Sequence, residues 1–346
     1  MKPPAFIRTF CFRMGLFFLP VAVLFAFPLW VLWAAGELTS VDRIVEKQQR
    51  SPEPVLVGLA YSNPEKYFKL RSFLTRRSDV VVLGNSHMMA FRGEFFKNKK
   101  FYNAAVGGSR LPDFKNFVDH IPAGMEPKVL IAGLDPFFAK PDFDWSKKGE
   151  ERFEREAGAL GAVRILGSAW KSVYRDYSHG KFDAQTLSRA SHGPGTAIGL
   201  EALMRDSGFL KDGSHVDTKE SSAFSGEVPD YSNLKRGESF DAQGLRYLKE
   251  FLEACRRRGI HVIGILPPTR EAVYEQLCST GYRYWEDLPQ VLGPVFKKYG
   301  YSFYDFSRPS LYGGTNDEFY DDFHASETAF QRIAGKLTAS EKGLRA

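Results

Sequence analysis

The chain has few cysteines and lacks the common metal-binding and nucleotide-binding motifs. Its 346 residues contain three cysteines, Cys11, Cys255 and Cys278, and no CxxC pair. There is no HExxH pair and no GxxxxGK[ST] sequence, so we predict neither a metal site nor a cofactor. Cys255 and Cys278 could pair outside the cytoplasm, but two buried thiols are the favoured interpretation.

Strongly basic stretches are missing as well. The net charge is +6, and the basic residues form small clusters among many acidic ones. No nucleic-acid recognition motif accompanies them, so nucleic acid is not a predicted partner. The pattern favours a solvated surface, or attraction to anionic lipid or polymer. Length and mixed composition are typical of one large globular domain or two small ones.

Charge is absent from a long segment near the N-terminus. Residues 14–36 are 23 consecutive residues without a charged side chain, and a helix needs about 20 apolar residues to cross a membrane. Pro20 and Pro28 are tolerated in membrane helices. Basic residues precede the segment and acidic residues follow it, which predicts a cytoplasmic N-terminus (1–13) and an external remainder. The sequence thus predicts a single-pass anchor in a bacterial cytoplasmic membrane, with a periplasmic or otherwise extracytoplasmic domain.

Two other interpretations of residues 14–36 compete. A cleaved signal peptide would use Ala34-Ala35-Gly36 as its small-residue site, but the apolar run is long for a signal peptide. A buried helix of a soluble core is disfavoured, since the segment has no polar face. An uncleaved transmembrane helix therefore remains the leading interpretation.

The rest of the chain alternates predicted strands with predicted helices. The strands are short runs of apolar residues, at 79–83, 100–105, 128–132, 259–266 and 301–306. Helical patterns lie between them, at residues 111–120, 241–258 and 271–299. Ser326 is placed to cap a last helix that ends near residue 337. The alternation predicts an α/β fold with a parallel sheet covered by helices on both faces.

Two regions do not follow this alternation. Residues 37–78 indicate a juxtamembrane helix and a linker to a domain at 79–340. Residues 137–240 are rich in Gly, Ser, His, Asp and Lys, with only patchy helical signals. We interpret them as one long insertion between the third and fourth strands, of the kind that often forms a lid or a partner-binding surface.

Polar residues and glycines follow four of the predicted strands. After the first, second, third and fifth strands come, in turn, Gly84-Asn85-Ser86-His87, Gly107-Gly108, Asp135, and the loop with Asp321 and His324. In an open parallel sheet, ligands bind beyond the carboxyl ends of the strands. We therefore expect these groups to converge on one edge of the sheet.

Three of these residues are the types that nucleophilic acyl transfer requires. A serine hydroxyl is a poor nucleophile until an adjacent base takes its proton, and His324 would be that base for Ser86. Asp321 would orient the imidazole and favour its charged form, and its spacing makes it a better partner than Asp322. Each motif alone has an ordinary explanation, because turn serines are commonly N-caps and loop histidines are commonly exposed; their joint occurrence favours catalysis.

The oxyanion of a tetrahedral intermediate needs preorganised donors. Backbone N–H groups near Ser86 and at Gly107 or Gly108 are candidates, because glycine lets the backbone approach closely. Further residues predicted to contact the oxyanion or the substrate are Asn85, Asp135 and His87. For His87 a plain packing role is the alternative.

These motifs resemble the SGNH (GDSL-like) hydrolase superfamily in their order and distance. Three blocks match the family pattern: Gly84-Asn85-Ser86, Gly107 or Gly108, and Asp321 with His324. The resemblance covers roughly residues 78–136 and 241–337, and it implies a flavodoxin-like sheet of about five parallel strands between helices. The GxSxG turn of ordinary α/β-hydrolases is missing, since Met88 lies two residues after the serine.

One position departs from the family pattern. The third block of the family carries an asparagine that donates to the oxyanion, whereas this chain has Gly133-Leu134-Asp135-Pro136. An ionised aspartate cannot donate a hydrogen bond. Three alternatives follow: Asp135 is protonated, the oxyanion hole uses backbone and other donors, or the activity is reduced.

The anchor and the missing asparagine make the chain more similar to the envelope acyl-transfer branch, which includes the D-alanyl-transfer protein of teichoic acid D-alanylation and the alginate O-acetylation proteins. This resemblance implies transfer of an acetyl-type or D-alanyl-type acyl group, through an acyl-serine, to a hydroxyl of an envelope polysaccharide or teichoic-acid-like polymer. It implies a membrane-bound O-acyltransferase as partner. The alternatives are an esterase that removes acyl groups and a non-catalytic glycan-binding partner of such an acyltransferase.

Overall fold

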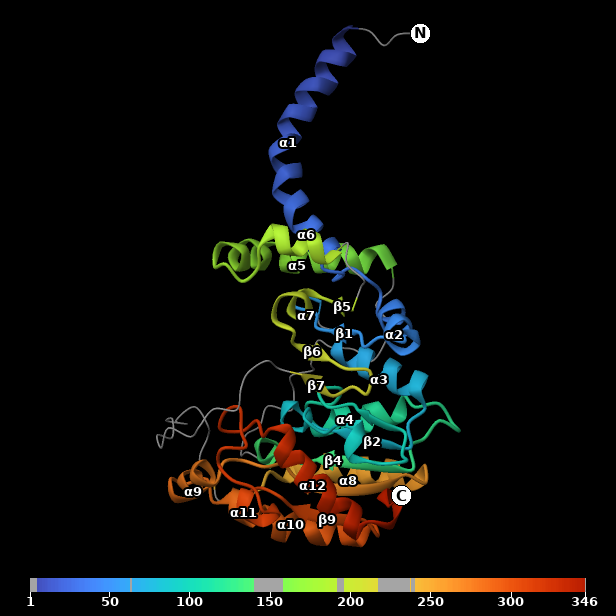
Figure 1. Ribbon diagram of the computed structural model, residues 1–346, viewed down its shortest axis with the longest axis vertical. Coiled ribbons are helices and arrows are strands. Elements are labelled where there is room, and N and C mark those ends of the chain that lie inside the picture. The colour runs from blue at the N-terminus through green and yellow to red at the C-terminus, as the bar shows by residue number, and fades with distance from the viewer. Residues whose placement is uncertain are drawn as a thin grey trace.

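The computed structural model describes residues 5–62, 64–139, 158–191, 196–216, 237 and 240–345. Figure 1 shows an elongated molecule, with helix α1 (Ala5–Ala34) at one end, a small sheet in the middle and a larger sheet at the other end. We call the described residues of 5–62 and 158–216 the α1 module, and those of 64–139 and 240–345 the main domain.

The main domain is built on a five-stranded parallel sheet. Its strands are β2 (Val80–Leu83), β3 (Phe101–Asn103), β4 (Val129–Gly133), β8 (His261–Leu266) and β9 (Ser302–Asp305). They lie in the order β3-β2-β4-β8-β9, which is the doubly wound order of flavodoxin-like folds. The five strands predicted from the apolar runs are therefore confirmed, and so is the α/β class with a parallel sheet.

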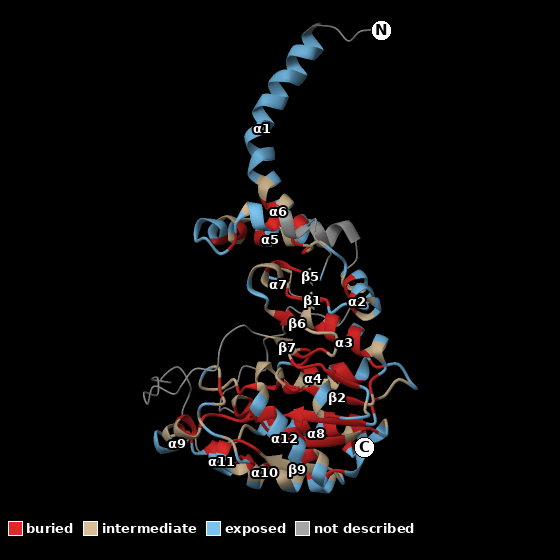
Figure 2. Ribbon diagram, viewed as in Figure 1, coloured by how far each residue is buried: buried red, intermediate tan, exposed pale blue. Residues whose placement is uncertain are grey.

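Alternating side chains of these strands pack into two separate cores. Val81 and Leu130 point to one face, where they join α4 (Leu111–Asp119), α8 (Ala242–Arg257), α9 (Glu271–Ser279) and α10 (Tyr284–Lys298). Val80 and Val82 point to the other face, against α12 (Glu327–Ser340). Figure 2 shows that burial concentrates in this sheet and its flanking helices. Both faces are covered, which explains why the strands are apolar throughout rather than alternating.

The predicted helices are present, with two local corrections. The pattern at 271–299 forms two helices, α9 and α10, because Gly281 adopts a left-handed conformation (φ 104°) between them. Ser326 does begin α12, but its side chain makes no capping hydrogen bond. The short helices of the main domain are α3 (Glu65–Arg76), η1 (Ser86–Met88), η2 (Gly93–Phe95), η3 (Pro136–Ala139), α11 (Pro309–Tyr312) and η4 (Lys342–Leu344).

The α1 module combines the segment after α1 with part of the insertion at 137–240. Its four-stranded sheet has the order β5-β1-β6-β7 and mixed strand directions. Each strand has two residues: β1 (Leu56–Val57), β5 (Ala197–Ile198), β6 (Gly208–Phe209) and β7 (His215–Val216). Its helices are α2 (Val41–Arg50), α5 (Gly158–Ser178), α6 (Ala184–Ser191) and α7 (Leu200–Arg205). The insertion thus returns toward α1 instead of staying beside the main sheet.

Glu37, just beyond the end of α1, holds this module together. Its carboxylate is buried and accepts hydrogen bonds from the backbone N–H groups of Ala60 (2.7 Å), Tyr61 (3.2 Å), Ser62 (3.1 Å) and Leu200 (3.0 Å). The Ser62 hydroxyl donates to it as well. One carboxylate therefore joins the segment after β1 to the start of α7, and replaces the water that these N–H groups lose on folding.

The two parts of the molecule meet at the loop after the first strand of the main sheet. Lys69, on α3, is fully buried and donates to the carbonyl oxygens of Asn103 (3.1 Å) and Gly213 (2.5 Å). The N–H of His215 donates to the carbonyl of Met89 (3.1 Å). The β6–β7 hairpin of the α1 module thus contacts the loop that follows Ser86 directly.

Candidate active site

Ser86 lies on a tight turn at the carboxyl end of β2, the strand next to the central strand β4. Gly84 and Asn85 follow the strand, and Ser86 begins the short helix η1. Met88 packs in the core between Gly84 and Gly133, where a β-carbon on either glycine would collide with its side chain. The side-chain oxygen of Asn85 accepts the N–H of His87 (3.1 Å) and fixes the turn. Packing on the sheet therefore determines where the serine hydroxyl lies.

The loop with Asp321 and His324 reaches the same edge from the other end of the chain. Phe319 and Ala325 form a bridge across the base of this loop. Nε2 of His324 lies 2.9 Å from the Ser86 hydroxyl, and its Nδ1 lies 2.8 Å from a carboxylate oxygen of Asp321. Since a carboxylate only accepts, Nδ1 carries the proton and Nε2 is the acceptor for the serine hydroxyl in the neutral ring. The structure brings the three predicted residues into a hydrogen-bonded chain.

Local backbone groups keep Asp321 ionised. One of its oxygens accepts the N–H groups of Phe323 (2.9 Å) and His324 (2.8 Å). Partial desolvation acts to raise the pKa of Asp321, but the hydrogen bonds from the His324 ring and from these two N–H groups outweigh it and hold the pKa well below its usual range. The carboxylate therefore remains a charged acceptor for the imidazole through mildly acidic pH.

Arg270 anchors the same loop and was not predicted from the sequence. It is buried at the carboxyl end of β8, and its backbone N–H donates to the Asp322 carbonyl (3.1 Å). Its guanidinium donates to the carbonyls of Asp321 (3.1 Å) and Phe319 (3.2 Å). A lone arginine after a strand carries no recognisable motif. Its position after the fourth predicted strand, at the edge where the other groups converge, was the one available signal.

Asp135 forms a second carboxylate–imidazole pair beside the first. Its side chain is fully buried and makes a short ion-pair contact with Nδ1 of His87. The same carboxylate accepts hydrogen bonds from the Asn85 amide (2.7 Å) and the Phe137 N–H (2.8 Å). The imidazole rings of His87 and His324 lie edge to face, with centroids 4.8 Å apart. Asn85, His87 and Asp135 thus form one network that borders Ser86.

The charge state of Asp135 settles one of the alternatives left open by the sequence. Burial acts to raise its pKa, but the charge and hydrogen bonds of His87, with those of Phe137 and Asn85, bring the pKa below its ordinary value. Asp135 is therefore an ionised acceptor and not a protonated donor. It cannot take the place of an asparagine that donates to an oxyanion.

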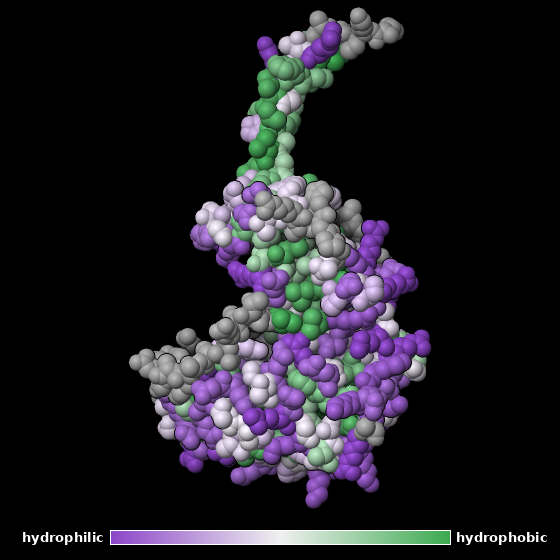
Figure 3. Space-filling model, viewed as in Figure 1, coloured by the Kyte–Doolittle hydropathy of each residue, from purple (hydrophilic) through white to green (hydrophobic). Residues whose placement is uncertain are grey.

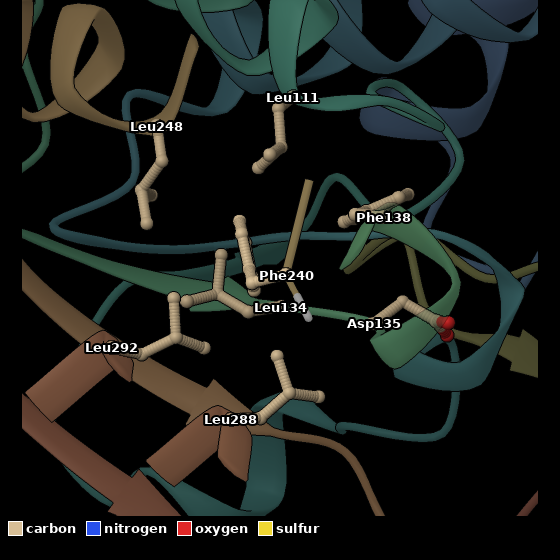
Figure 4. Close-up of a pocket in the computed structure, with 8 residues that line it drawn as sticks. All are labelled: Leu111, Leu134, Asp135, Phe138, Phe240, Leu248, Leu288 and Leu292. Carbon is tan, nitrogen blue, oxygen red and sulfur yellow. The ribbon is translucent and has the colours of Figure 1, made fainter. Parts of the chain in front are cut away.

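A small apolar cavity lies behind Asp135. It is lined by leucines and phenylalanines together with Asp135. Figure 4 shows the Asp135 carboxylate directed away from the leucine side chains, which gather on the other side of its backbone. This apolar surrounding keeps the local dielectric low and strengthens the pairing of the carboxylate with His87.

The two glycines predicted to contact the oxyanion differ in how their N–H groups are used. The N–H of Gly107 donates a hydrogen bond to the Ala104 carbonyl (2.9 Å), which favours Gly108 over Gly107 as the predicted oxyanion donor. The adjacent Val106 donates to the Gly84 carbonyl (2.8 Å), which places this turn beside the serine turn. Within the described residues, no acceptor is found for the N–H groups of Ser86 and Gly108.

Other predicted features concern thiols and metals. Cys255 is buried and Cys278 is half-buried, and both are free thiols. Burial raises the pKa of Cys278 to about 11, which keeps its thiol protonated and unreactive. No group of His, Cys, Asp and Glu side chains that could hold a metal ion is found in the described parts of the chain.

Comparisons with known proteins add no relative to this picture. No family model matches the chain, and neither a curated protein nor a solved structure shows significant similarity to it.

Proposed function

We propose that this protein is a membrane-anchored, extracytoplasmic acyltransferase that works through an acyl-serine. The observation that carries the proposal is the chain of contacts from Ser86 to His324 and from His324 to Asp321, at 2.9 and 2.8 Å. This arrangement matches what a serine nucleophile needs, namely a neutral base in contact and a carboxylate that orients the base. The order of the motifs in the sequence, which resembles SGNH hydrolases, supports the same chemistry.

In the proposed first step, the Ser86 oxygen attacks the acyl carbonyl while Nε2 of His324 takes the hydroxyl proton. Asp321 stabilises the imidazolium that forms. When the tetrahedral intermediate collapses, the bond to the leaving group breaks and His324 returns the proton to that group. In the second step an acceptor hydroxyl attacks the acyl-serine, and His324 takes its proton and gives it to Ser86. The acyl group ends on the acceptor, and the enzyme is regenerated.

The oxyanion needs donors other than Asp135. The N–H groups of Ser86 and Gly108 are two candidates, and we propose His87 as a third. Asp135 binds Nδ1 of His87, and within the described residues Nε2 has no partner. The side chain of His87 is 10% exposed, so a substrate in the site can contact it. In its protonated form, His87 would donate a charge-assisted hydrogen bond in place of the missing asparagine.

The anchor and the charges that flank it support the proposed external location. Helix α1 is long and apolar enough to cross a membrane over Phe6–Ala34, and most of that span is exposed. The end of α1 is packed against the insertion helices, with Val31 and Leu32 fully buried. Cleavage after Gly36 would remove part of that core, which favours an anchor over a cleaved signal peptide. The resemblance to the envelope acyl-transfer proteins implies that the acceptor would be a hydroxyl of an envelope polymer, and that a membrane-bound O-acyltransferase would supply the acyl group.

An acyl-transfer assay on the full chain in detergent tests the proposal. The assay follows release of p-nitrophenol from p-nitrophenyl acetate, with and without an added envelope polysaccharide. We expect Ser86→Ala to abolish release, whereas Ser168→Ala, a change of an exposed serine on α5, leaves it unchanged. Acceptor-dependent acetylation of the polysaccharide supports a transferase. Hydrolysis that the acceptor does not affect supports the esterase alternative, and activity retained by Ser86→Ala overturns the proposal.

A further inference from the structure

We propose that helix α5 lies on the outer surface of the membrane, with its aromatic edge in the lipid interface and its basic edge against anionic headgroups. The inference rests on the proposed membrane placement of α1, and it goes beyond the acyl-transfer chemistry. It assigns to part of the insertion the role of setting the height and orientation of the molecule above the bilayer.

The length of α1 determines where the outer boundary of the membrane would lie. Its 30 residues extend about 45 Å, whereas the hydrocarbon core of a bilayer is about 30 Å thick. About 20 residues from Phe6 onward would therefore fill the core, which brings the chain to the level of Leu24 and Phe25. The remaining turns, including Val31 and Leu32, are buried against other residues of the α1 module. The outer membrane boundary estimated in this way falls where α5 contacts α1. Figure 1 shows α5 crossing near the end of α1, and Figure 3 shows the apolar surface of α1 that extends beyond this region.

Helices α1 and α5 are in direct contact at this level. The hydroxyl of Tyr174 donates to the backbone carbonyl of Leu24 (2.9 Å), and Trp170 packs on Phe25 with ring centroids 5.7 Å apart. Tyrosine and tryptophan are the residues that collect at membrane interfaces, because one end of each is apolar and the other polar. Their position on α5 coincides with the boundary estimated from the length of α1.

Helix α5 also exposes large apolar side chains. Val163 is 66% exposed and Tyr177 is 46% exposed, and among the described residues they are the only large apolar side chains outside α1 that are strongly exposed. At 100° per residue, Val163, Trp170, Tyr174 and Tyr177 fall on one edge of the helix. This edge is the one that contacts α1 at Leu24 and Phe25, so it faces along α1 toward the bilayer.

Basic side chains of α5 lie beside this edge. Arg164, Lys171 and Arg175 are exposed and each follows a residue of the aromatic edge by one position, so they form a parallel basic edge, in which Arg175 also pairs with Asp176 (3.4 Å). The ammonium group of Lys171 lies over the Trp170 ring, 5.5 Å from its centroid. An amphipathic helix with aromatic residues on one edge and basic residues beside them is typical of elements that lie in the membrane interface. Anionic lipid headgroups are the ligand that this basic edge fits.

The orientation is fixed because α5 is joined firmly to the rest of the module. Asp176, on the inner side of α5, accepts hydrogen bonds from the Tyr61 hydroxyl (3.1 Å) and from Lys181 (2.9 Å). Tyr61 is in turn held through its N–H by Glu37. Contact of α5 with lipid therefore determines how the whole module sits, and the main domain is positioned through the Lys69 junction.

A depth measurement on the full chain tests the inference. Val163→Cys is made in a Cys11→Ser, Cys278→Ser background, which leaves only the buried Cys255, and the new thiol is labelled with an environment-sensitive fluorophore. The chain is reconstituted in vesicles of phosphatidylglycerol and phosphatidylcholine, with or without brominated lipid as quencher. Lys336→Cys, on an exposed position of α12 in the main domain, is the matched control.

We expect brominated lipid to reduce the emission of the label at position 163 at least twofold and to leave the control unchanged. We also expect Arg164→Glu with Lys171→Glu to remove at least half of this quenching, whereas Lys297→Glu with Lys298→Glu, a matched change in the main domain, has no effect. If brominated lipid quenches the label at position 163 no more than it quenches the control label, in vesicles that carry the chain, the lipid contact is overturned. This result is expected if a protein partner covers α5 instead.

Quenching that depends on neither anionic lipid nor the basic residues overturns the assignment of anionic headgroups. Flotation of the same vesicles separates these outcomes from a failure of the anchor, because a chain that does not float with the vesicles has no spanning α1, and this overturns the placement of α5 too. The readout does not use acyl transfer, so loss of the proposed activity leaves the test intact.

Discussion

The two sheets of this molecule differ in how they are held together. The main sheet has strands of three to six residues whose side chains pack into two apolar cores. The sheet of the α1 module has strands of two residues, taken from segments up to 160 positions apart, and depends on the buried carboxylate of Glu37, while Lys69 of the main domain holds its β6–β7 hairpin. In the main domain, apolar packing positions the candidate catalytic residues. In the α1 module, a few polar contacts hold the elements that connect the main domain to α1.

This difference leads to a division of effects. Changes to the catalytic residues should alter the chemical step and leave the free energy of unfolding nearly unchanged, since the main core does not depend on them. Changes to the buried charges of the α1 module should alter stability and leave the chemistry intact. The four predictions that follow test this division, first for the chemical step and then for stability, in each case from the larger expected effect to the smaller.

Loss of the base is expected to have the largest effect. His324→Ala should lower the rate of acyl transfer about 10³–10⁴-fold, because Ser86 then has no proton acceptor. The measurement is kcat for release from an activated ester, alongside thermal unfolding of the same sample. His120→Ala, a change of the exposed histidine that follows α4, is the matched control and should keep full activity. A large loss of stability in His324→Ala would contradict the separation of effects on the chemical step from effects on stability.

Removal of the charge at Asp135 should have the next largest effect. Asp135→Asn supplies the residue that the SGNH pattern has at this place, yet we expect it to lower kcat about 10–100-fold with little change in KM. The reason is that Asp135 acts through His87, and a neutral amide holds the imidazolium less well. His87→Gln should cause a similar loss, and the double variant should lose little more than either single one. An increased rate in Asp135→Asn would contradict the proposed role of His87.

Glu37→Gln addresses the other side of the comparison. The amide has one acceptor oxygen for five donors and presents its own N–H groups to the rest, so we expect a loss of about 2–4 kcal/mol in the stability of the α1 module. Hydrogen exchange at residues 59–62 and 199–203 should become faster, with unchanged exchange in the main sheet. Glu46→Gln, at an exposed position of α2, is the control and should change neither.

Lys69 lies between the two parts and should give the smallest effect. Burial lowers its pKa to about 7, whereas the pKa in the unfolded chain is near its ordinary value of about 10.4. Between these values the unfolded chain binds more protons, so stability should rise with pH and the cost of burying the charge should be fully present below pH 7.

Relative to Lys69→Met, the native chain should gain about 2 kcal/mol between pH 7 and pH 9. Denaturant unfolding of both chains at the two pH values measures this difference, and Lys297→Met, at an exposed position of α10, is the control. Equal pH dependence in the two chains would show that Lys69 titrates normally and that the junction is more open than the structure shows.

The same difference explains which features the sequence predicts. The strands of the main sheet are continuous apolar runs that read locally, and parallel strands place their carboxyl ends on one edge, so residues as distant as Ser86 and His324 were predicted to meet. Strands of two residues have no periodicity. The pairing of Val57 with Ile198 depends on buried contacts of Glu37 that no local pattern indicates.

Single residues illustrate the same limit within the site. The sequence identified Asp135 as a departure but could not show that its carboxylate is buried and accepts three hydrogen bonds, which decides its charge. It placed Gly107 near the serine but could not show that its N–H is already used within the turn. Arg270 escaped notice because its role is to hold carbonyl groups of a distant loop. These features depend on directions of bonds that only the folded chain defines.

Covalent labelling of Ser86 tests the central claim most directly. The full chain is treated with a serine-directed fluorophosphonate, and the modified peptide is identified by mass spectrometry. The account predicts labelling at Ser86 in the native chain, with the rate reduced at least 100-fold in His324→Ala and unchanged in His120→Ala. A folded chain in which Ser86 stays unmodified, or in which loss of the imidazole at position 324 leaves the labelling rate unchanged, would contradict it.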